Sequence, residues 1–265
     1  MKKLILSAAV FAAFATSATA QTAAPASPHT FTGNLAVVSD YRFRGISQSF
    51  RQPAVQGGFD YSHSSGFYVG NWNSSVSGLS YPGGAGIEMD FYAGYKFEPV
   101  KDVLLDVGAL YYYYPGALVA GTTKKFNNGE IYLSGAYKWF SAKYSYGVTD
   151  FFGLNSTTAP GYAFSALTPN GNSKGSGYLD LNGNFEVADK TTLNLHVGHQ
   201  TVKNYGALSY TDYKIGIAKE FSFATVGLAF ITTNADTAFY KLSNGINSTK
   251  NTGKSTAVVS ISKTF

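Results

Sequence analysis

Cysteine is absent from the 265-residue sequence, and only 13% of its residues are charged. Without cysteine the fold cannot depend on disulfides. Water-soluble proteins carry about a quarter of charged residues, so this composition does not suit a surface that faces water alone. Long apolar runs are also missing, because no stretch after residue 20 is long enough to span a bilayer as a helix. A membrane protein with this sequence would therefore have to cross with β-strands.

Aromatic residues and glycine are abundant, with 20 Tyr, 20 Phe and 29 Gly. Aromatic rings pack well on pleated strands and glycine tolerates bends, so this composition favours antiparallel β-structure. The formal net charge is +5 and becomes +3 without Lys2 and Lys3. Because the longest basic cluster is Lys124-Lys125, the charge does not indicate a nucleic-acid partner.

The first 20 residues have the features of a secretory signal peptide. Lys2 and Lys3 form a positive start, residues 4–15 are apolar, and Ala18-Thr19-Ala20 is a small-residue cleavage site. The apolar stretch is too short for a transmembrane anchor. We therefore expect a signal peptide over 1–20, cleavage before Gln21, and a flexible periplasmic lead over the Ala/Pro-rich residues 21–30.

From Phe31 onward the dominant period of the sequence is two. In residues 87–97 every odd position is apolar or aromatic, whereas Glu88, Asp90 and Lys96 occupy even positions. Such alternation is typical of a strand with one apolar and one polar face. We expect about twelve strands in residues 31–265, over 31–44, 54–62, 65–76, 86–97, 102–114, 128–138, 140–151, 176–187, 190–203, 208–219, 221–233 and 254–265.

The connectors between these strands alternate strictly between short and long. The short set is 62–66, 98–102, 138–140, 187–190 and 219–221, and the long set is 45–53, 77–85, 115–127, 153–175, 203–207 and 234–253. Tight periplasmic turns alternating with longer external loops are typical of outer-membrane barrels. The sequence thus predicts an all-β, antiparallel, up-and-down transmembrane barrel with both termini in the periplasm.

The C-terminal strand ends in Phe265 after alternating apolar residues. This end resembles the signal that the outer-membrane assembly machinery reads, although Lys263 departs from the usual apolar residue two places before the end. The run VSDYRFRGISQ at 38–48, with QPAVQGGFDY at 52–61 and SGFYVG at 65–70, resembles the TorF-type porin family of proteobacteria. The resemblance implies an outer-membrane barrel, and it offers no catalytic residues to carry over to this sequence.

Charged residues on the polar strand faces are the candidates for a functional lining of the barrel. A charge on the lipid face at mid-bilayer would cost about 2–4 kcal/mol, so we expect these side chains to point into the lumen. Arg42, Arg44 and Arg51 are the only arginines, all in or beside the first predicted strand. The predicted lumen lining is Asp40, Arg42, Arg44, Asp60, Glu88, Asp90, Lys96, Asp102, Asp106, Asp180 and Glu186.

Two interpretations of Arg42 and Arg44 remain open from the sequence. They could form a cationic patch that selects anionic solutes, or a structural ion-pair network with acids of neighbouring strands such as Asp60, Glu88 or Asp90. We favour the network, since buried charges must usually be paired. The tyrosines at 111–114 end a predicted strand and favour an interfacial aromatic girdle, with Tyr112 also able to narrow the lumen.

Enzymatic and metal chemistry find little support in the sequence. Strand parity places His196 toward the lumen and His199 outward, and no serine lies where it could form a nucleophile pair with either. The sequence has no cysteine and no HxH or HExxH spacing for a metal site. We expect no enzyme activity and no cofactor.

These observations predict a channel in the outer membrane of a Gram-negative bacterium for the passive diffusion of small polar solutes. Its expected partners are outer-membrane lipid, the assembly machinery and those solutes. The alternative is a non-conducting barrel whose external loops act in adhesion or recognition. A filled lumen would favour that alternative.

Overall fold

The computed structural model describes residues 27–81, 85–162, 167–243 and 248–265. Twelve antiparallel strands form one closed barrel in which neighbours in sequence are neighbours in the sheet, and β1 closes on β16. The barrel strands are β1 (His29–Val38), β4 (Ala54–His63), β5 (Phe67–Ser75), β6 (Ile87–Val100), β7 (Val103–Tyr113), β8 (Asn128–Tyr137), β9 (Phe140–Gly147), β10 (Gly177–Ala188), β11 (Thr191–Thr201), β12 (Tyr210–Glu220), β13 (Thr225–Thr233) and β16 (Thr256–Thr264).

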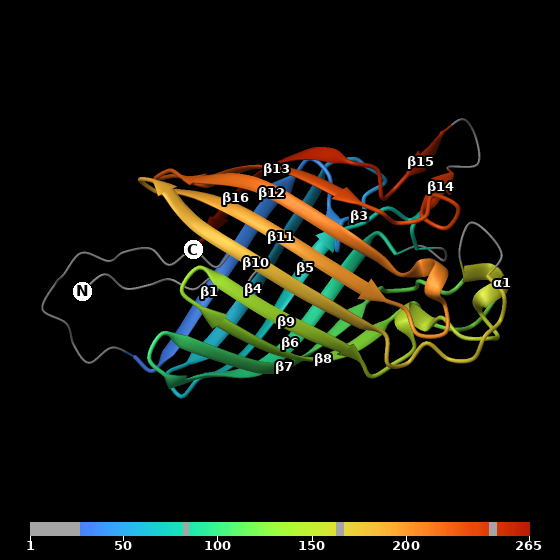
Figure 1. Ribbon diagram of the computed structural model, residues 1–265, viewed down its shortest axis with the longest axis horizontal. Helices are drawn as coiled ribbons and strands as arrows, with labels where there is room; N and C mark the ends of the chain where they lie inside the picture. The colour runs from blue at the N-terminus through green and yellow to red at the C-terminus, as the bar shows by residue number, and fades with distance from the viewer. Residues whose placement is uncertain (1–26, 82–84, 163–166, 244–247) are drawn as a thin grey trace, which may run out of the picture.

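The remaining elements are small and lie in the longer connections. These are β2 (Arg42–Phe43), β3 (Ile46–Ser47), η1 (Phe151–Gly153), α1 (Ala159–Tyr162), η2 (Gly206–Leu208), β14 (Lys241–Ser243) and β15 (Thr249–Asn251). Figure 1 shows α1, β14 and β15 at one end of the barrel. None of the helices in the described residues has the length and apolar character needed to cross a membrane.

The barrel wall separates apolar from polar side chains by strand parity. On β8, Ile131 and Leu133 are 50% and 60% exposed on the outer wall, whereas Glu130 and Ser134 are buried inside. The same alternation recurs on β4, where Phe59 is 75% exposed and its neighbour Asp60 accepts a hydrogen bond from Asn34 of β1 inside the barrel. Side chains of successive strand residues point to opposite faces of the sheet, so the period of two produces this separation.

The prediction of a twelve-stranded antiparallel barrel is confirmed, and each predicted strand has an observed counterpart. The short and long connections alternate as expected, and the start of β1 lies at the same end as the end of β16, because Asn34 pairs with Thr264. The location of that end in the periplasm stays a prediction. The predicted signal peptide at 1–20 lies outside the described residues, and β1 begins at His29, within the predicted lead 21–30.

The prediction for the first strand is wrong at its C-terminal end. We expected one strand over 31–44, but β1 stops at Val38, and residues 39–53 leave the sheet. Asp40, Arg42 and Arg44 therefore do not share a strand face. The period of two continues through Phe43 but cannot report the left-handed backbone of Arg44 (φ 47°) and Gly45 (φ 80°), which turns the chain into the small β2–β3 hairpin.

Candidate functional site in the barrel lumen

Residues 39–53, here called the inward segment, cross the inside of the barrel. Tyr41 donates a hydrogen bond to Glu88 of β6, and Arg44 contacts Glu130 of β8. Gly45 lies against the opposite wall, since a Cβ built there would be 2.5 Å from Cγ2 of Thr233 on β13. One short segment thus touches strands on both sides of the lumen and forms its constriction.

Arg44 is the main link between the inward segment and the wall. Its Nη2 donates to both carboxylate oxygens of Glu130 at 2.9 and 2.7 Å, and Nη1 donates to Oε1 of Gln200 at 2.7 Å. The guanidinium lies 4.7 Å from the ring centre of Phe43 and 4.3 Å from that of Tyr178. The ion pair is buried on both sides, so each charge depends on its partner for solvation.

Arg42 holds the inward segment to the connection between β13 and β16. It forms a 2.7 Å ion pair with Asp40 and donates to the backbone carbonyl oxygens of Gly45 and Thr252, each at 3.0 Å. Asp40 also accepts a hydrogen bond from Ser47 at 2.6 Å. Both arginines predicted to line the lumen are therefore engaged in ion pairs, but with Asp40 and Glu130 rather than with Asp60, Glu88 or Asp90.

Aromatic side chains fill the lumen on the loop side of the inward segment. Phe43 packs edge-on against Tyr112 of β7 at 5.4 Å and against Phe152 of η1 at 5.9 Å. Tyr81 stacks on Tyr114 at 4.2 Å, and the Tyr114 hydroxyl donates to the fully buried Glu88 at 2.6 Å. Tyr112 accordingly belongs to the lumen packing rather than to an interfacial girdle.

A cavity of about 500 Å³ lies on the other side of the inward segment. It reaches from Arg44 and Tyr178 to Thr264 and Asn184, near the end of the barrel with short turns. Most of its lining comes from β1, β10–β13 and β16, and much of that lining is polar. The barrel therefore contains solvent-sized space that the inward segment separates from the loop end.

The predicted lumen residues take different positions in the structure. Asp90 and Asp180 line this cavity, as do Asp40, Arg42 and Arg44 of the inward segment, and Asp60, Glu88, Lys96 and Asp106 lie on inward strand faces elsewhere. Glu186 has the same parity but is exposed near the short-turn end of β10. The prediction for Asp102 is wrong, since it lies in the turn between β6 and β7, where its φ of 67° ends the strand pattern.

Several polar residues of the lumen were missing from the predicted set. Glu130 alternates with Ile131, so the parity rule that selected Glu88 could have found it, as it could Lys143, Asp212 and Lys214. His196, which strand parity placed toward the lumen, bridges two carboxylates, with Nδ1 3.0 Å from Asp180 and Nε2 2.8 Å from Asp212. Gln200 has the same parity as His196, but nothing in the sequence indicated its contact, because that depends on where the inward segment places Arg44.

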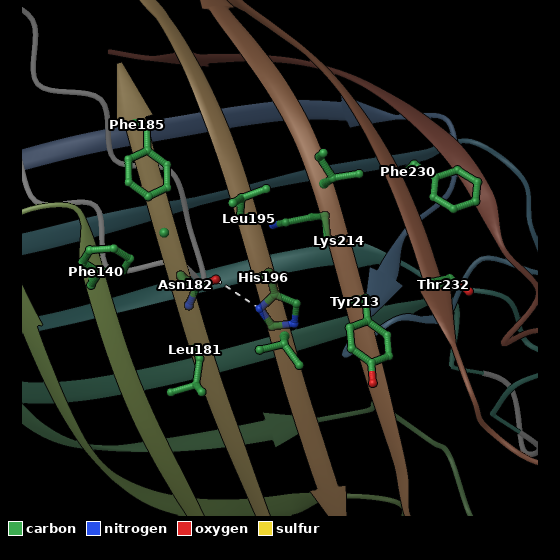
Figure 2. Close-up of a pocket in the computed structure, with 13 residues that line it drawn as sticks. Phe140, Leu181, Asn182, Phe185, Leu195, His196, Tyr213, Lys214, Phe230 and Thr232 are labelled. Atoms are coloured by element: carbon green, nitrogen blue, oxygen red, sulfur yellow. Dashed lines mark hydrogen bonds between the residues drawn. The ribbon is translucent and has the colours of Figure 1, made fainter. Parts of the chain in front are cut away.

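The outer wall carries a separate hollow of about 460 Å³ over β9–β13. Figure 2 shows the strands concerned, on which Leu181, Leu195 and Tyr213 of the outer face alternate with Asn182, His196 and Lys214 of the inner face. The hydrogen bond between Asn182 and His196 is part of the inner network. The outer lining is mostly apolar, so this hollow suits contact with lipid hydrocarbon rather than a catalytic site.

A family match covers nearly the whole chain. The bacterial family Gcw_chp, described as of unknown function, matches residues 22–265. The chain belongs to the Gcw_chp family. A comparison with curated proteins finds no match, and the TorF name suggested by residues 38–70 is not confirmed.

Solved structures of porins share the fold of this Gcw_chp protein. The KdgM porin aligns with a TM-score of 0.50 at 7% identity over 88% of this chain and 98% of that chain. A KdgM porin in complex with disordered oligogalacturonate aligns with a TM-score of 0.50 at 7% identity, over 89% of this chain and 99% of that chain. The NanC porin aligns with a TM-score of 0.49 at 10% identity, over 88% of this chain and 98% of that chain. At such identities the KdgM likeness shows a porin-like fold alone.

Proposed function

We propose that this Gcw_chp protein is an outer-membrane, porin-like channel through which small polar solutes diffuse passively. The observation that carries the proposal is the cavity of about 500 Å³ inside a closed barrel, whose lining includes charged side chains such as Lys143, Asp180 and Lys214. Porins use such a lumen as an aqueous path, and lumen width grows with strand number. Twelve strands give a narrower path than the sixteen or so of large porins, and the inward segment narrows it further.

The outer wall supports a place in a lipid bilayer. Every barrel strand contributes exposed apolar side chains to this wall, from 36% exposed for Val197 to 75% for Phe59. A continuous apolar surface of this kind would aggregate in water, and a closed barrel satisfies the backbone hydrogen bonds that hydrocarbon leaves unpaired. Outer-membrane lipid and the assembly machinery are the partners that follow from this location.

The channel proposal includes neither enzyme activity nor a cofactor. The ring nitrogens of His196 contact Asp180, Asp212, Asn182 and Tyr178, so the ring is held in a network without a serine partner among the described residues. The KdgM porin, whose fold is similar, has been captured in complex with disordered oligogalacturonate, and this supports a barrel lumen that accepts polar solutes.

A second candidate function is a non-conducting barrel that acts through its external loops. The aromatic packing of Phe43, Tyr112 and Phe152 favours it, because this cluster occupies the lumen between the inward segment and the loops. In a channel, the path must run beside this cluster or open when the cluster shifts. In a non-conducting barrel, the cluster is a permanent plug.

Planar-bilayer recordings of the refolded chain from Gln21 onward separate the two functions. We expect discrete conductance steps from the wild type and larger steps from the double variant Phe43→Ser/Arg44→Ser, which removes the two side chains that cross the lumen. Lys124→Ser, an exposed substitution in a loop, is the control and should match the wild type. A silent wild type with a conducting double variant would identify a plugged barrel, and silence of both folded proteins would reject the channel.

A further inference from the structure

Two of the lysines that line the cavity have ammonium groups without an ion pair or a hydrogen bond in the described part of the chain. Lys143 of β9 and Lys214 of β12 both line the cavity beyond the inward segment and are half-buried. Among the described residues, neither ammonium group has a carboxylate oxygen within 4.0 Å, and neither forms a hydrogen bond. The Lys143 ammonium lies over the Tyr132 ring, 4.2 Å from its centre.

The carboxylates near these lysines are already occupied by other donors. Asp180 accepts from Asn182 at 2.7 Å and contacts His196 at 3.0 Å. Asp212 contacts His196 at 2.8 Å and accepts from the Tyr178 hydroxyl at 2.9 Å. The two carboxylates therefore have short contacts to neutral donors and to the imidazole. The three N–H donors of each lysine ammonium are not used in these contacts.

The arginines at the cavity show the opposite situation. Arg42 and Arg44 are bound by Asp40 and Glu130, so they contribute structure but little free binding capacity. A half-buried charge without a partner is costly to desolvate, and an anion from solution would remove that cost. Lys143 and Lys214 are the groups in this cavity that are free to meet such an anion.

We propose that Lys143 and Lys214 form a binding subsite in the lumen for small solutes that carry carboxylate or phosphate groups. This inference rests on the proposed channel for its physiological meaning, since the subsite lies on the path between the short-turn end and the inward segment. Ammonium groups bind oxyanions as point charges without a fixed geometry. The subsite therefore selects for charge rather than for one particular anion.

Calorimetric titration of the refolded protein in zwitterionic detergent at low ionic strength tests the subsite directly. The probes are citrate and glucose 6-phosphate, with glucose as the uncharged match for the latter. We expect both anions to bind the wild type and glucose not to bind. Added sodium chloride should weaken binding, because salt screens exposed charges. Binding of glucose as strong as that of glucose 6-phosphate would overturn the proposal.

Substitutions then assign the binding to the two lysines. Lys143→Gln/Lys214→Gln should weaken citrate binding about tenfold, which corresponds to about 1.4 kcal/mol. Lys143→Arg/Lys214→Arg should retain it. Lys101→Gln, in the exposed turn between β6 and β7, is the matched control. If the double Gln variant lowers thermal stability but keeps the wild-type affinity, the lysines are structural and the proposal is wrong. Should that variant not fold, the single Gln variants decide by the same criterion.

The titration and the bilayer recordings test the subsite and the channel separately. Citrate binding that depends on both lysines in a protein without conductance would keep the subsite and reject the channel. Conductance whose anion-to-cation permeability ratio is the same in the wild type and the double Gln variant, without citrate binding, would keep the channel and reject the subsite. Conductance with a ratio that shifts toward cations in the double Gln variant supports both.

Discussion

At the scale of single residues, the Arg44–Glu130 pair is the contact on which the inward segment depends most. Both side chains are at least 93% buried, and removal of one partner would leave an uncompensated charge. We predict that Arg44→Met lowers the free energy of unfolding by about 3–5 kcal/mol, measured by urea denaturation of the protein in liposomes. Arg44→Met/Glu130→Gln should recover a large part of this loss, because neither charge is then left alone.

Lys124→Met is the control for this measurement. Lys124 lies 3.7 Å from Asp150, but its side chain is 48% exposed, and exposed pairs contribute about 0–1 kcal/mol. Equal effects of Arg44→Met and Lys124→Met would show that the buried pair does not anchor the segment.

Gly45 gives a second prediction at this scale, because the segment approaches the wall there without a side chain. Gly45 has φ +80°, and a Cβ would lie 2.5 Å from Thr233 and 2.7 Å from Asp212. Gly121 has a similar φ of +74° but nothing within 4 Å. We predict that Gly45→Ala destabilises the barrel by about 1–3 kcal/mol more than Gly121→Ala, since only the former adds a clash to the backbone strain. Equal losses in urea denaturation would contradict the close approach.

At the scale of elements, the period of two was enough to predict the barrel strands but not the inward segment. Residues 87–97 alternate cleanly, and β6 (Ile87–Val100) begins one residue after the predicted start at 86 and ends three residues after the predicted end at 97. Residues 39–44 alternate just as well, yet they leave the sheet. Their partners, such as Glu130 and Gln200, are 86 and 156 residues away from Arg44. A local pattern contains no information about such contacts, so the strand parity of Asp40, Arg42 and Arg44 was misleading.

A further prediction concerns Phe265, which follows the end of β16, and its role in assembly of the barrel. Phe265 donates its backbone N–H to the carbonyl of Gly33 at 2.8 Å and accepts in return at 3.1 Å, while its ring is 74% exposed. Deletion of Phe265 would remove these bonds, so Phe265→Ala is the cleaner change. We predict that it lowers the amount of assembled barrel in cells, seen as heat-modifiable protein on gels, and leaves the free energy of unfolding of the refolded protein nearly unchanged.

Phe223→Ala provides the comparison for the assembly experiment. Phe223 is 64% exposed in the turn between β12 and β13, so it matches Phe265 in chemistry but does not end the chain. Normal assembly of Phe265→Ala would mean that the terminal ring is not the signal. A similar defect in Phe223→Ala would instead point to general anchoring of aromatic rings at the membrane interface.

At the scale of the whole molecule, the apolar wall, the ion-paired constriction and the partly open cavity together describe an asymmetric barrel. The aromatic cluster and the inward segment occupy the loop end, whereas the cavity reaches toward the short turns. Because of this asymmetry, the orientation of the barrel in the membrane decides which part of the lumen a solute meets first. If the long connections face outward, solutes meet the constriction before the lysines of the cavity. The reversed orientation would put the lysines at the outer mouth.

An accessibility experiment decides the orientation. We predict that a short epitope inserted at Gly171, in the exposed connection between β9 and β10, binds antibody on intact cells. An epitope between Ala188 and Asp189, in the short turn after β10, should bind only after the outer membrane is permeabilised. The physical reason is that twelve strands place successive connections on opposite sides of the bilayer. Heat modifiability of each tagged protein controls for folding, and labelling of the short-turn tag on intact cells would mean that the barrel is inserted the other way round.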